Sequence, residues 1–72
     1  MGRHYKSILD AVRNGEIKVE AQVKITGHYA PNSEIEGVIC KVDSQFIYVL
    51  NDHDPWMISL ENATAQIEIL TD

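Results

Sequence analysis

The segment "DHDPW", residues 52–56, contains the residue types that a metal centre needs. Aspartate and histidine bind metal ions, but ligand atoms from adjacent residues rarely converge on one ion. We therefore interpret the segment as a turn with local hydrogen bonds, and we predict no metal site. Trp56 is expected to pack in a core or against another subunit rather than to stack on a base.

No residue pattern typical of an enzyme is present in the sequence. None of the serines lies in a glycine-flanked elbow, and no glycine-rich loop that could cradle a phosphate occurs. The single cysteine, Cys40, lies in an apolar run and is expected to be a buried free thiol, which makes it a poor nucleophile. We therefore expect neither catalysis nor a cofactor.

Two loops contain side chains that could bind a partner. The first is Asp43-Ser44-Gln45, which we interpret as an Asx-turn joining two strands. The alternative is a nucleotide-binding rim, although the turn lacks an aromatic ring that could stack on a base, an interaction worth about 1–3 kcal/mol per base. The second loop, "GHYAPNS", presents Tyr29, which could contact a partner or simply cover the surface.

The spacing of apolar residues predicts one helix and five strands that would position these loops. A stripe of Tyr5, Ile8, Leu9 and Val12 predicts a helix over residues 4–13. Strict alternation then predicts a long strand over residues 16–26. Shorter apolar segments between turn residues predict the other strands, over residues 34–42, 45–51, 56–60 and 63–70.

A glycine inside the second strand indicates how the sheet is shaped. Gly37 lies in mid-strand, where glycine lowers stability unless the strand bends sharply. Strong bending closes small barrels. Residues 1–72 are therefore expected to form one mainly β domain, a small, strongly bent five-stranded barrel with a short N-terminal helix.

Size and charge favour self-association and disfavour some partners. A chain of 72 residues buries a core that supplies only about 3–5 kcal/mol, so oligomerisation is expected. The formal charge of −5 counts against non-specific nucleic-acid binding, although every basic residue except Lys41 lies within residues 1–28. A soluble, cytoplasmic protein is expected, because the sequence shows no signal peptide and no run of the roughly 20 apolar residues that span a membrane.

Two segments resemble the motifs of the Sm-like family, which includes Sm, LSm and Hfq-like proteins. "GVICKVDSQFIYVLN" is similar to the first motif, with Gly37 and Asp43 at its glycine and turn aspartate. "MISLENATAQIEIL" resembles the second motif, two strands joined by a short break at Glu61-Asn62. The resemblance covers nearly the whole chain and implies an SH3-like barrel that forms a homo-oligomeric ring and binds single-stranded RNA.

The resemblance also implies which residues would bind RNA. Asp43, Gln45 and Asn62 fall on the nucleotide-binding positions, although Gln45 replaces the usual stacking ring and Glu61 lies where a basic residue is usual. A polar Gln or Asn side chain could still bond a base edge. The expected basic contribution comes from the N-terminal segment, either as a positive face of the ring or as an ordinary solvated helix face: Arg3, His4, Lys6 and Arg13.

The ring itself would arise from unpaired strand edges. The last two predicted strands would leave backbone groups and apolar side chains exposed, and such edges pair with a neighbour. Head-to-tail pairing closes into a ring when the rotation fits. The expected interface residues are Ile58, Leu60, Ile67 and Ile69. Two alternatives remain open: a scaffold ring that binds protein instead of RNA, and a monomeric SH3-like adaptor.

Overall fold

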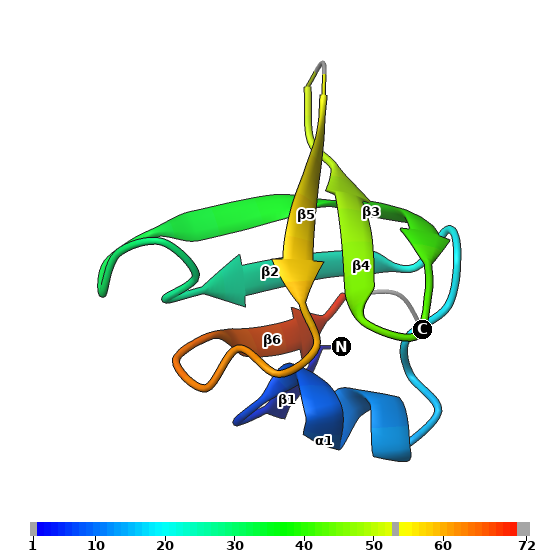
Figure 1. The fold of residues 1–72 in the computed structure, drawn as a ribbon, viewed down its shortest axis with the longest axis horizontal. Coiled ribbons are helices and arrows are strands. Elements are labelled where there is room, and N and C mark those ends of the chain that lie inside the picture. The colour runs from blue at the N-terminus through cyan, green and yellow to red at the C-terminus, as the bar shows by residue number, and fades with distance from the viewer. Residues whose placement is uncertain (1, 53, 71–72) are drawn as a thin grey trace.

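The chain forms one antiparallel sheet of six strands with a short helix at one end. The computed structural model describes residues 2–52 and 54–70. Its strands are arranged in the order β1-β6-β2-β3-β4-β5 (Figure 1). The mainly β prediction is confirmed. The elements are β1 (Arg3–Tyr5), α1 (Ile8–Arg13), β2 (Gln22–Thr26), β3 (Glu34–Val42), β4 (Phe46–Leu50), β5 (Pro55–Ser59) and β6 (Gln66–Ile69).

The sheet turns sharply along β3, so that β4 and β5 run across the direction of β2 (Figure 1). The pairing of β3 with β4 shifts register between Ile39 and Lys41, and such a bulge bends a strand. Gly37 lies just before this bulge, but the bulge does not explain why the residue is glycine. A Cβ atom at residue 37 would lie 2.3 Å from the carbonyl oxygen of Leu50. Glycine is therefore required because the β4 backbone approaches β3 closely at this position.

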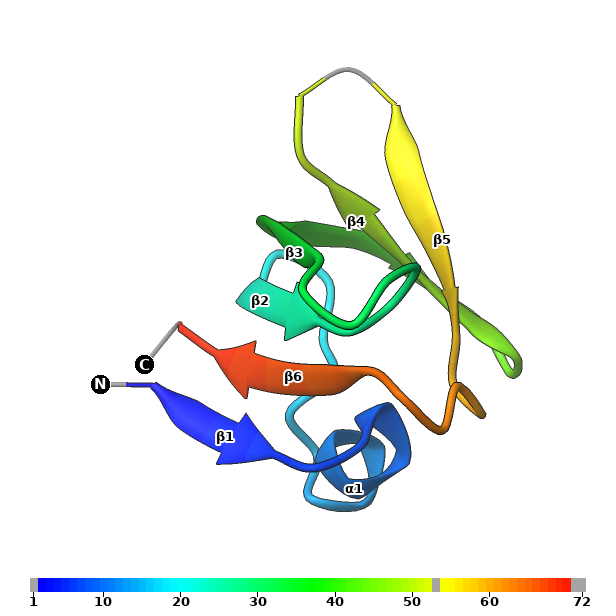
Figure 2. The same ribbon diagram turned by 90° about the vertical axis from the view of Figure 1, so that its left-hand side faces the viewer.

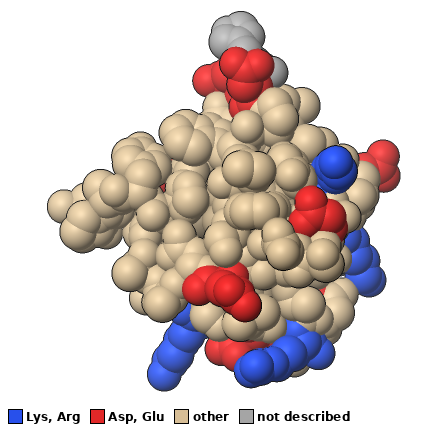
Figure 3. Space-filling model, viewed as in Figure 1, with Lys and Arg blue, Asp and Glu red and all other residues tan. Residues whose placement is uncertain are grey.

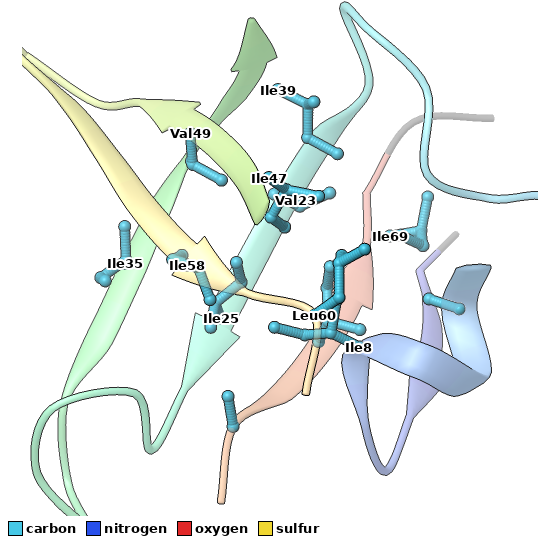
Figure 4. Packing of buried hydrophobic residues seen from close by; sticks show 13 residues of the cluster. Ile8, Val23, Ile25, Ile35, Ile39, Ile47, Val49, Ile58, Leu60 and Ile69 are labelled. Atoms are coloured by element: carbon cyan, nitrogen blue, oxygen red, sulfur yellow. The ribbon is translucent and has the colours of Figure 1, made fainter. Parts of the chain in front are cut away.

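The hydrophobic core lies inside this bend and is closed at one end by α1 (Figure 4). Alternate residues of the strands point into it, as the period of two in a strand requires. The opposite face of β3 is exposed, so the expected burial of Cys40 is wrong. The buried hydrophobic residues are Ile8, Ala11, Val23, Ile25, Ile35, Ile39, Ile47, Val49, Ile58, Leu60, Ala65, Ile67 and Ile69.

The N-terminal segment differs from the predicted helix over residues 4–13. The helix begins only at Ile8, after Ser7, whose Oγ accepts a hydrogen bond from the backbone N–H of Asp10 at 3.2 Å. The preceding residues, Arg3–Tyr5, form β1, which pairs with β6 (Figure 2). The extended conformation is favoured there because the backbone of Arg3–Tyr5 can then form hydrogen bonds with the edge of β6. A first helical turn could not pair with that edge.

Side chains fasten β1 to the connection that follows α1. Glu16 accepts hydrogen bonds from the Arg3 guanidinium and, at 2.9 Å, from the hydroxyl of Tyr5. These bonds favour the charged carboxylate, so the guanidinium of Arg3 and then the Tyr5 hydroxyl hold the pKa of Glu16 below its usual range. The N-terminal strand is therefore held by its side chains as well as by its backbone.

The predicted strand over residues 16–26 is also shorter in the structure. Only Gln22–Thr26 is strand, because the chain turns at residues 18–21, where the N–H of Ala21 donates to the carbonyl of Lys18. Glu20 has a φ of 79°, which lies outside the β region of backbone conformation. The alternation of apolar and polar residues therefore begins several residues before the strand itself, which starts at Gln22.

The predicted oligomer contacts are corrected by the position of β1. β6 is paired on both sides, with β2 and with β1, so it is not the open edge that the ring argument required. The four expected interface side chains lie in the core of the single chain, and none is more than 8% exposed: Ile58, Leu60, Ile67 and Ile69. β5, at the end of the sheet, keeps one outer edge.

Candidate functional site

The Asp43-Ser44-Gln45 turn, for which nucleotide binding was the alternative interpretation, is held by its own aspartate. The carboxylate of Asp43 accepts hydrogen bonds from the backbone N–H groups of Gln45 and Phe46, at 2.8 and 2.7 Å, and from the hydroxyl of Tyr48 at 3.4 Å. The two backbone N–H groups hold the pKa of Asp43 below its usual range. This is the bonding of an Asx-turn, and it engages both oxygens of the carboxylate.

Asn62 is likewise engaged in local structure, in the connection between β5 and β6. Its Oδ1 accepts hydrogen bonds from the backbone N–H groups of Thr64 and Ala65, at 2.9 and 3.0 Å, and from the Thr64 hydroxyl at 2.9 Å. Its Nδ2 lies 3.2 Å from Nδ1 of His28. Asn62 therefore ties the β5–β6 connection to the β2–β3 loop instead of facing Gln45.

Gln45 lies in a separate, polar hollow of about 280 Å³. The hollow forms because the backbone N–H of Leu60 donates to the carbonyl of Gln45, which joins the end of β5 to the β3–β4 turn. One acidic residue, Glu61, belongs to its lining and disfavours a phosphate there. The remaining lining residues are Ser44, Phe46 and Ser59.

The basic residues of the N-terminal segment lie on three different elements and interact in part with acidic neighbours. Arg3, on β1, forms an ion pair with Glu16. Arg13, at the end of α1, lies 3.7 Å from Asp10. Lys6, in the connection between β1 and α1, is exposed. Of these residues only Arg13 lies on the helix, so they do not share one helix face.

The most distinctive surface feature is a pair of stacked aromatic rings. Tyr29, in the β2–β3 loop, and Trp56, in β5, have ring centroids 5.5 Å apart and ring planes inclined by 11°. Both remain exposed, Tyr29 by 63% and Trp56 by 40%. The ring of His28 lies edge-on to both, at 6.3 and 6.4 Å. We call these three residues the aromatic cluster.

The β2–β3 loop holds Tyr29 in place through a closed set of hydrogen bonds. The N–H of Gly27 donates to the carbonyl of Ser33, and the buried Ser33 hydroxyl donates to the carbonyl of Ala30 at 2.8 Å. The single hydroxyl proton of Thr64 is shared between Oδ1 of Asn62 and the carbonyl oxygen of Gly27, each 2.9 Å away, so the loop is attached to the β5–β6 connection. Gly27, with a φ of 76°, adopts the left-handed conformation that favours glycine.

Trp56 reaches the loop because of its register on the β4–β5 hairpin. It lies opposite Val49, and residues paired across an antiparallel ladder point to the same face. The neighbouring pair on that face, Ile47 and Ile58, is fully buried, so Trp56 continues the core-facing side of the hairpin beyond the end of the core. There its ring meets Tyr29 instead of a further strand.

Hollows on the surface adjoin the aromatic cluster. One, of about 390 Å³, is lined by loop residues 27–31 and Thr64. A larger one, of about 580 Å³, is lined by Tyr29, Glu34, Asn51, Asp52, Asp54, Pro55 and Trp56. Acidic side chains gather at the tip of the β4–β5 hairpin, and the basic side chains on this face lie at the bottom and right of the view (Figure 3). The larger hollow thus combines aromatic walls with carboxylates.

The sequence alone does not indicate that Tyr29 and Trp56 contact each other. Each lies beside turn residues, but only the bend of the sheet places the β2–β3 loop against the start of β5. Within residues 2–52 and 54–70, no group of three or more His, Cys, Asp or Glu side chains could hold a metal ion. The helix in the same part of the chain lacks the length and apolar character of a membrane span.

Comparisons with protein-family models, with curated proteins and with solved structures find no match for this chain. The candidate site is defined by its geometry: two exposed rings, one on a hydrogen-bonded loop and one on a hairpin, beside a hollow with three carboxylates.

Proposed function

We propose that this chain is a protein-interaction module, a small bent barrel of Sm-like or SH3-like kind that binds a segment of a partner protein at the aromatic cluster. The observation that carries the proposal is the exposed stack of Tyr29 on Trp56. Buried aliphatic residues fill the core without either ring. The two rings thus contribute more to a binding surface than to the fold.

The geometry suits binding because it is arranged in advance. Aromatic side chains supply large contact areas with few rotatable bonds, and they are enriched at protein interfaces. Tyr29 is held by a hydrogen-bonded loop and Trp56 by the strand ladder, so neither has to be ordered when a partner arrives. Preorganisation of this kind raises affinity by lowering the entropy lost on binding.

A library of random peptides displayed on phage tests the proposal without a known partner. We expect the wild-type chain to enrich peptides whose binding, measured by anisotropy of a labelled copy, falls more than tenfold in Trp56→Ala and Tyr29→Ala. Such losses are typical when a central aromatic contact is truncated, about 2 kcal/mol or more.

Met57→Ala is the matched control. Met57 is the next residue of β5, is 54% exposed and lies on the other face of the hairpin, opposite Tyr48. It should leave peptide binding within about twofold of wild type, since surface substitutions away from a contact change energies by about 0.5 kcal/mol or less. If no peptide is enriched, or if Met57→Ala weakens binding as much as Trp56→Ala, the proposal is wrong.

RNA binding by a homo-oligomeric ring is a second candidate function. It is supported by the hollow of about 280 Å³ in which Gln45 lies with two serines, because hydroxyl and amide groups can bond base edges. The outer edge of β5 supports association, since an unpaired edge is a template for another strand. Glu61 in the same hollow and the net charge of −5 weigh against phosphate binding, which makes this the weaker candidate.

Native mass spectrometry and RNA titration decide this candidate. A ring predicts a single mass of several subunits and saturable, salt-sensitive binding of U-rich or A-rich RNA at micromolar protein. Glu61→Gln should then tighten RNA binding and Gln45→Ala should weaken it, whereas Gln66→Ala, on the exposed side of β6, should leave it unchanged. A monomer that binds neither RNA would exclude the candidate.

A further inference from the structure

We infer that the larger hollow beside the aromatic cluster binds a basic side chain, arginine above all, carried by an extended segment of the partner. The inference rests on the proposed function, because it names the ligand class of that same site. It depends on three features of the described residues: the charge of the lining, the flat face of the aromatic stack, and the free edge of β5.

The lining of the hollow is acidic. Glu34, Asp52 and Asp54 bring three carboxylates to it, and among the residues that the structure describes no lysine or arginine belongs to the lining. Lys24 reaches Glu34, with Nζ 3.1 Å from the carboxylate. Even with Lys24 counted, the two aspartates at the hairpin tip leave the hollow negative, which attracts a cation and repels phosphate.

The aromatic stack favours arginine over a compact ammonium group. A guanidinium ion is planar and weakly hydrated, so it stacks on aromatic faces while its N–H groups bond carboxylates at the edge. The chain makes a related contact on the outer face of the same hairpin, where Nζ of Lys41 lies 5.1 Å from the ring centroid of Tyr48. Asn51, also in the lining, adds an amide oxygen that can accept a hydrogen bond.

The free edge of β5 favours an extended segment. Leu60 donates its N–H to Gln45, and backbone bonding directions alternate along an antiparallel strand. The backbone groups of Met57 and the N–H of Ser59 therefore face away from β4, toward the open side of the last strand of the sheet, whereas the carbonyl of Ser59 already accepts a hydrogen bond from the N–H of Asn62. A segment added along this edge lies beside Pro55 and Trp56, which belong both to β5 and to the hollow.

Trp56 is the only tryptophan of the chain, so its fluorescence reports on the hollow directly. The probe is a capped heptapeptide of alternating threonine and arginine, which places the arginines on one face of an extended strand. The expected result is a saturable change in Trp56 fluorescence with the arginine peptide, a weaker one with a lysine peptide, and none with matched glutamine or glutamate peptides.

The double variant Asp52→Asn with Asp54→Asn should weaken binding of the arginine peptide about five- to tenfold, which is the combined effect of losing two exposed charge contacts. The matched control, Glu20→Gln with Glu61→Gln, removes the same total charge at exposed positions outside the lining and should change binding by less than about twofold. As a measurement independent of these variants, raising NaCl from about 50 to 500 mM should weaken wild-type binding severalfold.

Several results would overturn the inference, and the first three come from the peptide titrations. They are equal binding of the glutamine peptide, equal losses in the two double variants, and binding that does not respond to salt. If the phage library enriches neutral peptides that depend on Trp56, the proposed function stands and the basic ligand is wrong. If no peptide of any charge binds, both fail. Preferential binding of the glutamate peptide or of RNA would also refute the inference that the hollow binds a basic side chain.

Discussion

Replacing Ile67 by lysine is expected to unfold the chain rather than to separate subunits. Ile67 is fully buried in β6, which has a partner strand on each side. An unpaired ammonium group in an apolar core costs several kcal/mol, which exceeds the roughly 3–5 kcal/mol that a core of this size supplies. Circular dichroism at 25 °C should show loss of the sheet signal, and light scattering should show an expanded or aggregated chain.

The neighbouring residue provides the control for this substitution. Gln66→Lys adds the same charge to the same strand, one residue away, at an exposed position. It should retain the sheet signal and a melting temperature within a few degrees of wild type. If Ile67→Lys instead gives a folded monomer from a wild-type oligomer, then Ile67 lies at a subunit interface and the burial described here is not its main role.

The pairing of β1 with β6 shows what the sequence could and could not predict. Apolar segments between turn residues predicted strands at 34–42, 45–51 and 56–60, and β3, β4 and β5 lie within one residue of those bounds, because these segments bury one face against a common core. The helical spacing of Tyr5 with Leu9 wrongly predicted a helix at residues 4–7, because the extended conformation there depends on a hydrogen-bonding edge contributed by residues 66–69. Pairing between the two ends of a chain has no local signal.

The candidate site could not be predicted either, because it depends on contacts that the local sequence does not indicate. Asn62 carries a side chain that could bind a base, and the sequence alone could not show that its oxygen is used by neighbouring backbone groups. Tyr29 and Trp56 are 27 positions apart, and only the bend of the sheet stacks them. The Asx-turn at residues 43–45 was the exception, because its bonds connect residues no more than three apart.

Replacing Gly37 by alanine is expected to destabilise the chain by about 3 kcal/mol, the upper end of the usual cost of overpacking. The added Cβ would lie 2.3 Å from the carbonyl oxygen and 2.9 Å from the carbonyl carbon of Leu50, and 3.0 Å from a methyl group of Val49. Only the valine side chain can move easily. The carbonyl belongs to the ladder between β3 and β4, so relief of the clash requires the strands to separate. Urea unfolding followed by Trp56 fluorescence measures the effect.

Gly15 distinguishes this cause from conformational strain. Gly15 has a φ of 71°, and a Cβ atom there would meet nothing within 4 Å. Gly15→Ala should therefore cost only the left-handed strain of about 1–2 kcal/mol. Gly37 is absent from the positive-φ glycines, so a rule based on φ alone predicts the opposite order. A smaller loss in Gly37→Ala than in Gly15→Ala would show that the β4 backbone does not approach β3 so closely at Gly37.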